Sequence, residues 1–83
     1  MVVQGKKILI TGGTGFIGAA TAERLAEGNE LVLYDLKQGG PIEYTDLLER
    51  DNVRFVQGDI CDEAQMEAAL DGVDIVIHAA AVV

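Results

Sequence analysis

Residues 11–18 read Thr11-Gly12-Gly13-Thr14-Gly15-Phe16-Ile17-Gly18, and they stand between a short apolar run and a stretch with helical spacing. The glycines satisfy two spacings at once, Gly13-x-Gly15-x-x-Gly18 and Gly12-x-x-Gly15-x-x-Gly18. In a strand–turn–helix unit, the first glycine of such a motif permits a sharp turn. The second lets the backbone approach a pyrophosphate, and the third lets the helix pack closely on the strands. The pattern therefore predicts a dinucleotide-binding turn, with an unliganded strand-to-helix turn as the alternative.

The segments on either side of this turn predict a strand and a helix. Residues 7–11 read Lys7-Ile8-Leu9-Ile10-Thr11, with a continuous rather than alternating apolar run, as in a parallel strand covered on both faces. Over residues 16–27, Gly18, Ala22 and Leu25 recur at i, i+4 and i+7, and Gly28 is a candidate C-cap. The turn thus has the strand and the helix that a dinucleotide site requires.

The rest of the chain continues the alternation of strands and helices. Apolar runs predict strands at 30–35, 53–57 and 73–78, and a short helix is expected at 44–49. Asp62 and Gln65 form a capping-box pair that opens a further helix, which ends at Gly72. Right-handed crossovers between parallel strands give the order 3-2-1-4. We therefore expect a three-layer, doubly wound α/β sheet, truncated to four strands, as a single half domain over residues 1–83.

The composition and net charge of the chain limit the classes of partner that it can bind. Six basic and fourteen acidic residues give the 83-residue chain a formal net charge of −8, so nucleic acid is not expected, because phosphate-backbone binding needs a concentrated basic face. A diphosphate can still bind to the backbone N–H groups at a helix N-terminus. Cys61 is the only cysteine, which favours a reducing, cytoplasmic location. No apolar run approaches the ~18 residues of a membrane span, so no membrane partner is expected.

Asp35 ends the second predicted strand, where the motif places an acidic residue for the adenosine ribose. A carboxylate accepts hydrogen bonds from the 2′ and 3′ hydroxyls but repels a 2′-phosphate, so NAD is preferred over NADP. Lys37, two residues later, could partly offset that repulsion, which leaves dual specificity open. The alternative for Asp35 is a solvated residue at the end of a strand.

With these motifs in place, the whole chain resembles the extended short-chain dehydrogenase/reductases, which include the NAD-dependent epimerases and dehydratases of nucleotide sugars. Residues 11–18 are similar to the phosphate loop of that family, and Tyr34-Asp35 to its ribose-binding strand end. Residues 58–62, with the sequence Gly58-Asp59-Ile60-Cys61-Asp62, resemble its adenine-contacting GDxxD segment, and His78-Ala79-Ala80-Ala81 resembles its HxAA element.

The resemblance implies that Asp59 hydrogen-bonds the adenine amino group and that the backbone of Ile60 lines the ring. It also implies that the small residues after the fourth strand lie along the cofactor. A turn or cap role is the alternative for Asp59, and plain core or helix packing for the alanines. The expected cofactor contacts are Gly12, Gly13, Thr14, Gly15, Phe16, Ile17, Gly18, Asp35, Leu36, Lys37, Asp59, Ile60, Ala79, Ala80 and Ala81.

The catalytic pair of that family, Tyr-x-x-x-Lys, has no match in the chain. Tyr34 is followed four residues later by Gln38, and Tyr44 by Leu48. His78 lacks partners for catalysis or for a metal site, so we expect a packed histidine at a strand end. Cys61 lies among acidic residues that disfavour a thiolate, and we expect it to be a small apolar filler.

The sequence therefore favours an NAD-binding module without catalytic residues of its own. One alternative is the N-terminal part of an active nucleotide-sugar epimerase, dehydratase or oxidoreductase that a missing segment or a partner chain completes. Another is an engineered folded fragment with an empty site. The fourth strand would leave Ile75-Val76-Ile77 on an apolar edge, which predicts a homodimer through that edge or exchange of terminal segments.

Overall fold

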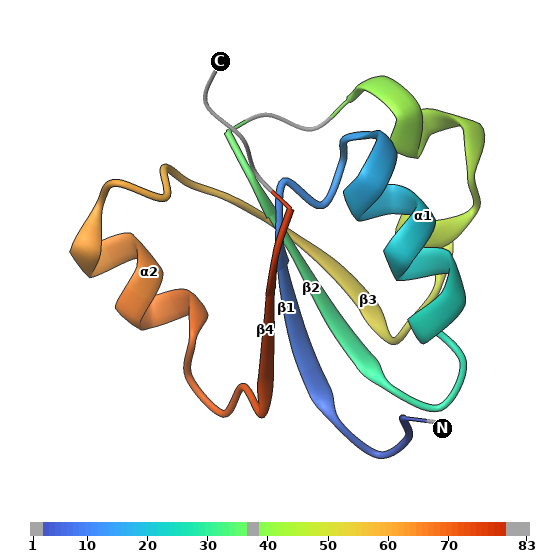
Figure 1. Ribbon diagram of the computed structural model, residues 1–83, viewed down its shortest axis with the longest axis horizontal. Helices are drawn as coiled ribbons and strands as arrows, with labels where there is room; N and C mark the ends of the chain where they lie inside the picture. Colours follow the sequence, from blue (N-terminus) through green and yellow to red (C-terminus); the bar gives the residue numbers. More distant parts are fainter. Residues whose placement is uncertain (1–2, 37–38, 80–83) are drawn as a thin grey trace.

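The computed structural model describes residues 3–36 and 39–79. The elements in chain order are β1 (Lys7–Thr11), α1 (Phe16–Leu25), β2 (Glu30–Asp35), the 3₁₀ helices η1 (Gly40–Tyr44) and η2 (Leu47–Glu49), β3 (Val53–Gln57), α2 (Glu63–Ala69) and β4 (Ile75–His78). The strands form one parallel sheet in the order β3-β2-β1-β4 (Figure 1). The predicted fold class and strand order are confirmed.

Strand β1 lies at the centre of the sheet and has a partner on each side. Its Ile8 is in register with Leu31 of β2 and with Ile75 of β4. On the outer side of β2, Leu33 is in register with Phe55 of β3. All four strands run parallel, so their carboxyl ends meet at one edge of the sheet, and the glycine-rich turn leaves β1 at that edge.

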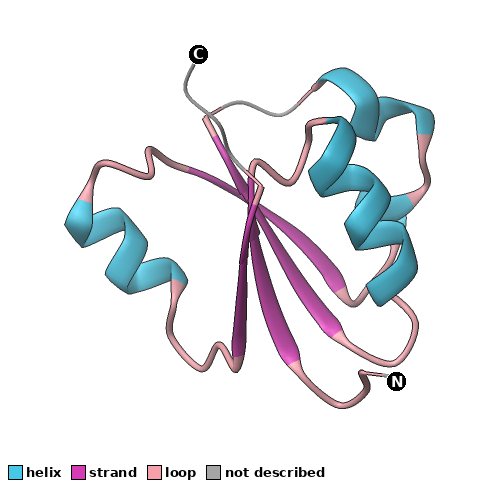
Figure 2. Ribbon diagram, in the orientation of Figure 1, coloured by secondary structure: helices cyan, strands magenta, loops and turns pink. Residues whose placement is uncertain are grey.

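The sheet separates two hydrophobic clusters, because successive residues of a strand point to opposite faces. Helix α1 and the 3₁₀ helices lie on one side of the sheet, and α2 lies on the other (Figure 2). On the α1 side, small residues of α1 and its C-cap pack against large strand residues: Ala19, Ala22 and Ala26 with Ile8, Ile10, Leu31 and Leu33. The α2 side is smaller and is built from Leu9, Val32, Tyr34 and Ala69.

Helix α1 ends at Leu25, two residues before the predicted end. The side chain of Asn29 explains this difference. Its Nδ2 donates to the carbonyl oxygens of Leu25 and Val3, each at 2.8 Å, and its Oδ1 accepts from the backbone N–H of Lys6 at 3.0 Å. These bonds satisfy a helix-end carbonyl from outside the helix. Gly28, at φ +83°, lies in the turn to β2 rather than directly after the helix.

The expected single helix at 44–49 is wrong, since η1 and η2 occupy this region with an extended residue, Thr45, between them. Its hydroxyl donates to Ile42 O at 2.8 Å and accepts from Leu47 N at 3.2 Å, which ends one turn and starts the next. The fourth strand begins at Ile75 rather than at residue 73. Before it, Asp74 is held to Lys7 by two bonds: its Oδ2 accepts from the backbone N–H of Lys7 at 2.9 Å, and its own N–H donates to Lys7 O at 2.8 Å.

The capping residue predicted for α2 is confirmed, because the Asp62 side chain accepts from Gln65 N at 3.0 Å. The return bond differs from that of an ordinary capping box. Gln65 Oε1 accepts from the backbone N–H of Asp59 at 2.8 Å, not from the N-cap residue itself. The start of α2 is therefore tied to the loop that follows β3.

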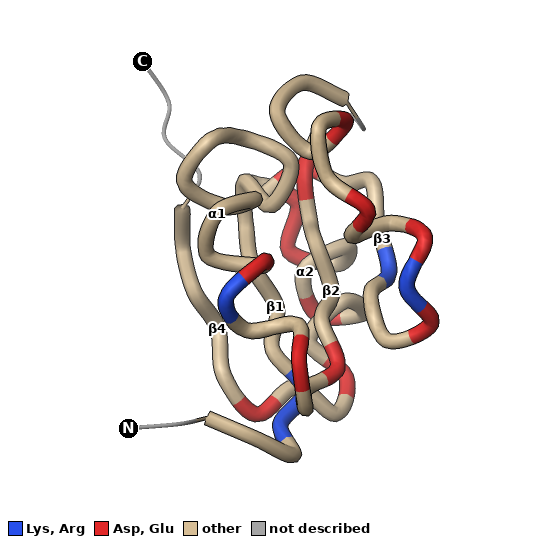
Figure 3. The backbone as a smooth tube through the Cα atoms, turned by 90° about the vertical axis from the view of Figure 1, so that its right-hand side faces the viewer, with Lys and Arg blue, Asp and Glu red and all other residues tan. Residues whose placement is uncertain are grey.

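Lys and Arg residues are dispersed among Asp and Glu residues (Figure 3). None of the helices formed by residues 3–36 and 39–79 is both long enough and apolar enough to cross a bilayer.

Within the described residues, strand β4 pairs with β1 alone, and Val76 at the centre of β4 is 50% exposed. Self-association through this edge stays a prediction.

Candidate functional site

The glycine-rich turn is a tight structure that leads directly from β1 into α1. Gly12 has φ +68°, a conformation that favours glycine, and its N–H donates to Tyr34 O at 2.8 Å. A Cβ at Gly18 would collide with the backbone of Gly12, and one at Gly13 would lie 2.8 Å from the Cβ of Leu33. The task predicted for Gly18 is therefore corrected: it allows α1 to pack on the turn itself, whereas Gly13 allows the turn to pack on the sheet.

The N-terminus of α1 is accessible. Gly15 is the N-cap residue and has no side chain to occupy the first N–H groups, and the first helical turn contains no acidic residue. The next two side chains are exposed, Phe16 by 82% and Ile17 by 72%. The helix macrodipole gives this end a partial positive charge that the acidic side chains of the protein do not supply.

Asp35 lies directly beside this turn. Its Oδ2 accepts from the Thr14 hydroxyl at 2.6 Å and from the Thr14 backbone N–H at 3.2 Å. Its Oδ1 accepts from Leu36 N at 2.8 Å. Asp35 is half-buried and anchored by these three bonds, so the alternative of a freely solvated strand-end carboxylate does not describe it.

The loop after β3 is held against the end of β2 by Tyr34. The phenol is fully buried, and its hydroxyl donates to Asp59 O at 3.0 Å. Gly58 N in turn donates to Asp35 O at 2.9 Å. Burial raises the pKa of Tyr34 above its ordinary value, and the carboxylates of Asp62 and Asp59 raise it further. Tyr34 therefore stays neutral and acts as a structural hydrogen-bond donor.

The side chain of Asp59 stabilises a turn, which is the alternative to adenine binding that the sequence left open. Its Oδ1 accepts from Cys61 N at 2.8 Å, which closes a local side-chain-to-backbone turn. The residue is exposed, and Ile60 beside it packs partly against the α2-side cluster. This local bond leaves the contact with adenine as a prediction.

These segments surround a pocket of about 300 Å³ at the carboxyl edge of the sheet. Its lining residues are Gly12, Gly15, Tyr34, Asp35, Leu36, Gly58, Asp59, Ile60, Cys61 and Ala79. Seven expected contact residues are among them: Gly12, Gly15, Asp35, Leu36, Asp59, Ile60 and Ala79. Gly13, Thr14, Phe16, Ile17 and Gly18 belong to the turn and to the start of α1 but do not line the pocket. Lys37, Ala80 and Ala81 lie outside the described residues.

Three lining residues were not among the expected contacts: Tyr34, Gly58 and Cys61. Gly58 and Cys61 belong to the GDxxD-like segment, so this motif marks the loop that lines the pocket and not only its Asp59 and Ile60. Cys61 is exposed, and the expectation of an apolar filler is wrong. It follows directly after Ile60, whose side chain takes up the apolar contact.

His78 ends β4, but it is exposed rather than packed, which corrects the expectation. Its Nδ1 and the Thr11 Oγ1 are hydrogen-bonded at 2.7 Å. No strand covers β4 on the other side within the described residues, and the ring therefore remains in solvent. Among residues 3–36 and 39–79, no group of three or more His, Cys, Asp or Glu side chains is placed to hold a metal ion.

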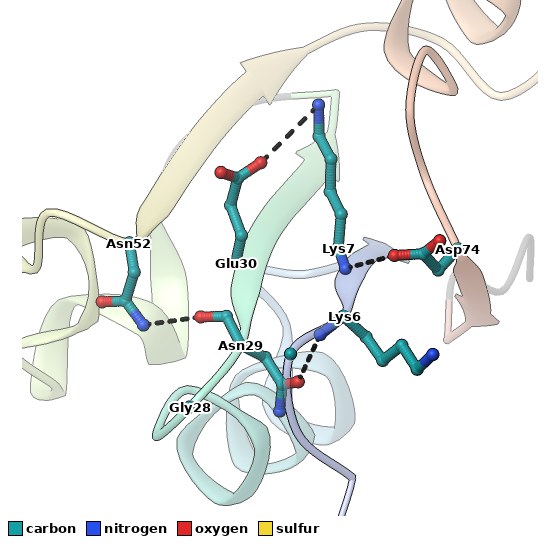
Figure 4. A pocket seen from close by; sticks show the side chains of 8 residues that line it. Lys6, Lys7, Gly28, Asn29, Glu30, Asn52 and Asp74 are labelled. Atoms are coloured by element: carbon teal, nitrogen blue, oxygen red, sulfur yellow. Dashed lines mark hydrogen bonds and ion pairs between the residues drawn. The ribbon is translucent and has the colours of Figure 1, made fainter.

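A larger depression of about 570 Å³ lies at the opposite, amino-terminal ends of the strands (Figure 4). Its polar groups bind one another: Asn52 Nδ2 donates to Asn29 O at 2.7 Å, and Lys7 Nζ lies 3.6 Å from Glu30 Oε2. Ligands of open α/β sheets bind at the carboxyl ends of the strands. The smaller pocket is therefore the candidate site.

A glycine turn that leads from the central strand into a helix, with an acidic residue at the end of the neighbouring strand, defines the dinucleotide-binding class of α/β domains. The chain belongs to the NAD dependent epimerase/dehydratase family, whose model matches residues 8–83. This membership confirms the resemblance seen in the sequence, and the chain corresponds to the N-terminal part of such proteins.

Known proteins agree with this assignment. The chain is 36% identical over 81 residues to the inverting UDP-N-acetylglucosamine 4,6-dehydratase of Campylobacter jejuni, and the match covers 94% of this chain and 24% of that protein. The solved UDP-N-acetylglucosamine 4-epimerase of Methanobrevibacter ruminantium is 29% identical with a TM-score of 0.83, over 96% of this chain and 26% of the other. WbmH of Bordetella bronchiseptica, solved in complex with NAD+, is 37% identical with a TM-score of 0.80, over 94% of this chain and 26% of the other. The chain thus spans about a quarter of the length of these relatives.

Proposed function

We propose that this chain binds NAD and serves as the N-terminal cofactor-binding part of an NAD-dependent epimerase or dehydratase. The observation that carries the proposal is the position of the Asp35 carboxylate, hydrogen-bonded to the glycine-rich turn at the rim of the 300 Å³ pocket. A solved relative that contains NAD+, at 37% identity, supports the same ligand.

The residues present fit the chemical parts of a dinucleotide. The pyrophosphate would lie at the N-terminus of α1, where Gly15 adds no side chain and the helix dipole favours negative charge. The adenosine ribose would bind at Asp35. The adenine would enter the pocket between Leu36 and Ile60, both of which line it. When bound, NAD supplies a hydride acceptor at its nicotinamide ring.

The preference for NAD over NADP is part of the proposal and rests on charge. Asp35 is anchored by three hydrogen bonds, so it cannot turn away from a ligand without losing them. A 2′-phosphate at this position would bring two negative groups together in a half-buried site.

We further propose that the acid–base residues of the complete reaction, which would act on a nucleotide sugar, lie outside these 83 residues. Neither Tyr34 nor Tyr44 has a lysine four positions later, and Tyr34 is fully buried. A cytoplasmic location, suggested by the single cysteine, belongs to the same proposal.

Cys61 provides a direct test, because it is the only cysteine, it is exposed and it lines the pocket. NAD should slow the alkylation of its thiol by a maleimide, with a concentration dependence that matches the binding isotherm from calorimetry. Nicotinamide mononucleotide, which lacks the adenosine half, should give no protection. Unchanged alkylation together with no heat of binding at roughly millimolar NAD, where any useful affinity would be visible, would exclude the proposed function.

A further inference from the structure

Thr14 is a buried polar residue at the centre of the candidate site, although it does not line the pocket. Only 4% of its surface is exposed. Its hydroxyl and its backbone N–H both donate to Asp35 Oδ2, and its carbonyl oxygen accepts from Ile42 N at 3.2 Å. One residue thus connects the glycine-rich turn with the end of β2 and with η1.

The Asp35 carboxylate has few acceptor positions left. A carboxylate offers about four lone-pair positions, two on each oxygen. On Oδ2 both are directed at Thr14, and on Oδ1 one is taken by Leu36 N. Counted over the residues that the structure describes, one acceptor position remains, on Oδ1, for a ligand hydroxyl. Without the bonds from Thr14, the Asp35 carboxylate would have acceptor positions for both hydroxyls of a ribose.

The two bonds from Thr14 are of different kinds. The hydroxyl contact of 2.6 Å is in the range of strong charge-assisted O–H···O⁻ bonds, whereas the N–H contact is longer, at 3.2 Å. Any residue at position 14 other than proline retains the backbone N–H. The orientation of the carboxylate therefore depends on the Thr14 side chain.

We propose that Thr14 is a positioning residue, whose hydroxyl fixes Asp35 so that Oδ1 faces a single ribose hydroxyl of the dinucleotide and thereby sets the selectivity for NAD over NADP. This inference rests on the proposed function. A carboxylate held in this way loses no further conformational entropy when it binds a hydroxyl. It also cannot rotate to relieve repulsion from a 2′-phosphate. Without the hydroxyl of Thr14, Asp35 loses its shortest hydrogen bond and gains rotational freedom, which weakens discrimination.

The test is calorimetric titration of NAD and of NADP into the wild-type chain and into variants at position 14. Thr14→Val should weaken NAD binding by about tenfold, as expected for the loss of one bond to a charged group. NADP binding should change less, so the ratio of the two affinities falls. Thr14→Ser keeps the hydroxyl and should retain both the affinity and the ratio. Thr14→Ala replaces Thr14→Val in this comparison if the valine variant fails to fold in thermal unfolding.

A double-mutant cycle shows whether Thr14 acts through Asp35. In the Asp35→Ala background, Thr14→Val should change neither affinity by more than about twofold, because no carboxylate remains to be positioned. A full additional loss in that background would overturn the inference, and so would an unchanged NAD/NADP ratio in Thr14→Val. If the wild-type chain binds no NAD at all, the proposed function itself fails, which is a separate result.

Discussion

The ring of Tyr34 lies against the backbone of Gly58, so closely that a Cβ at Gly58 would stand 2.8 Å from Tyr34 Cε2. The hydroxyl of the same ring donates to Asp59 O at 3.0 Å. Tyr34 therefore contacts two consecutive residues of the loop that forms one wall of the candidate pocket. The ring also belongs to the α2-side cluster, so the packing of that face and the shape of the pocket depend on one side chain.

This contact predicts the effect of Gly58→Ala. The added methyl group would have to displace a fully buried aromatic ring, and overpacking of this kind costs about 1–3 kcal/mol. The free energy of unfolding in urea should fall by that amount. Combining it with Tyr34→Leu, which removes the obstructing ring, should give a double variant that is more stable than the sum of the two losses. Strict additivity would mean that the ring is not the cause.

The raised pKa of Tyr34 predicts a loss of stability at alkaline pH. Burial, and then the carboxylates of Asp62 and Asp59, keep the proton on the folded phenol to a higher pH than on the unfolded chain. Above the ordinary tyrosine value of 10.0 the unfolded state therefore binds fewer protons, and stability decreases as the pH rises. Tyr34→Phe should flatten this part of the curve of unfolding free energy against pH.

The matched control for that experiment is Tyr44→Phe, which removes the other phenol of the chain from a position that is 92% exposed. If the unfolding free energy of Tyr34→Phe still declines at alkaline pH as it does in the wild type, groups other than Tyr34 cause the loss of stability. Titration of phenolate absorbance in the folded wild type should show that Tyr34 ionises at a higher pH than its ordinary value of 10.0.

Patterns in the sequence predicted the four strands, their order and the two α-helices, but not the two 3₁₀ helices. The β3 bounds at Val53–Gln57 and the cap at Asp62 agree with the structure, because periodicity and capping depend on near neighbours. Contacts between distant segments were not accessible in this way. The Thr14–Asp35 bonds span 21 residues and the Tyr34–Asp59 bond spans 25. The same limit explains the misplaced end of α1, which depends on Asn29 contacting Val3.

Gly15→Ala should separate ligand approach from folding. A Cβ at Gly15 would lie 3.4 Å from Gly12 O, an ordinary contact, whereas the one at Gly18 would collide with the same carbonyl group. Stability in Gly15→Ala should therefore change by less than about 1 kcal/mol, while NAD affinity falls because the methyl group stands where the pyrophosphate would approach. Gly18→Ala should lose stability instead. Wild-type NAD affinity in Gly15→Ala would contradict the assigned position of the pyrophosphate.

The outer edge of β4 predicts self-association of this chain. In antiparallel pairing of two copies centred on Val76, Ile75 would face Ile77 and Asp74 would lie opposite His78, so that apolar residues meet apolar residues and polar residues meet polar residues. Sedimentation equilibrium should show a dimer that Val76→Lys weakens. Ala64→Lys, an equal charge change at an exposed position of α2, serves as the control. A wild-type chain that stays monomeric over a wide concentration range would remove this prediction.

Asp35→Ala should change cofactor preference rather than abolish binding. The variant loses the acceptor for the ribose hydroxyl and also the charge that opposes a 2′-phosphate, so NAD affinity falls while NADP affinity holds or rises. Asp35 also accepts from Thr14 and Leu36, so some stability is lost as well, and thermal unfolding must accompany the titrations. Asp35→Asn is the matched variant, since it retains an acceptor oxygen without the charge. It should improve NADP binding and keep part of the NAD affinity. If both variants retain the wild-type ratio of NAD to NADP affinity, Asp35 does not contact the ribose, and the adenosine must bind elsewhere along the carboxyl edge of the sheet.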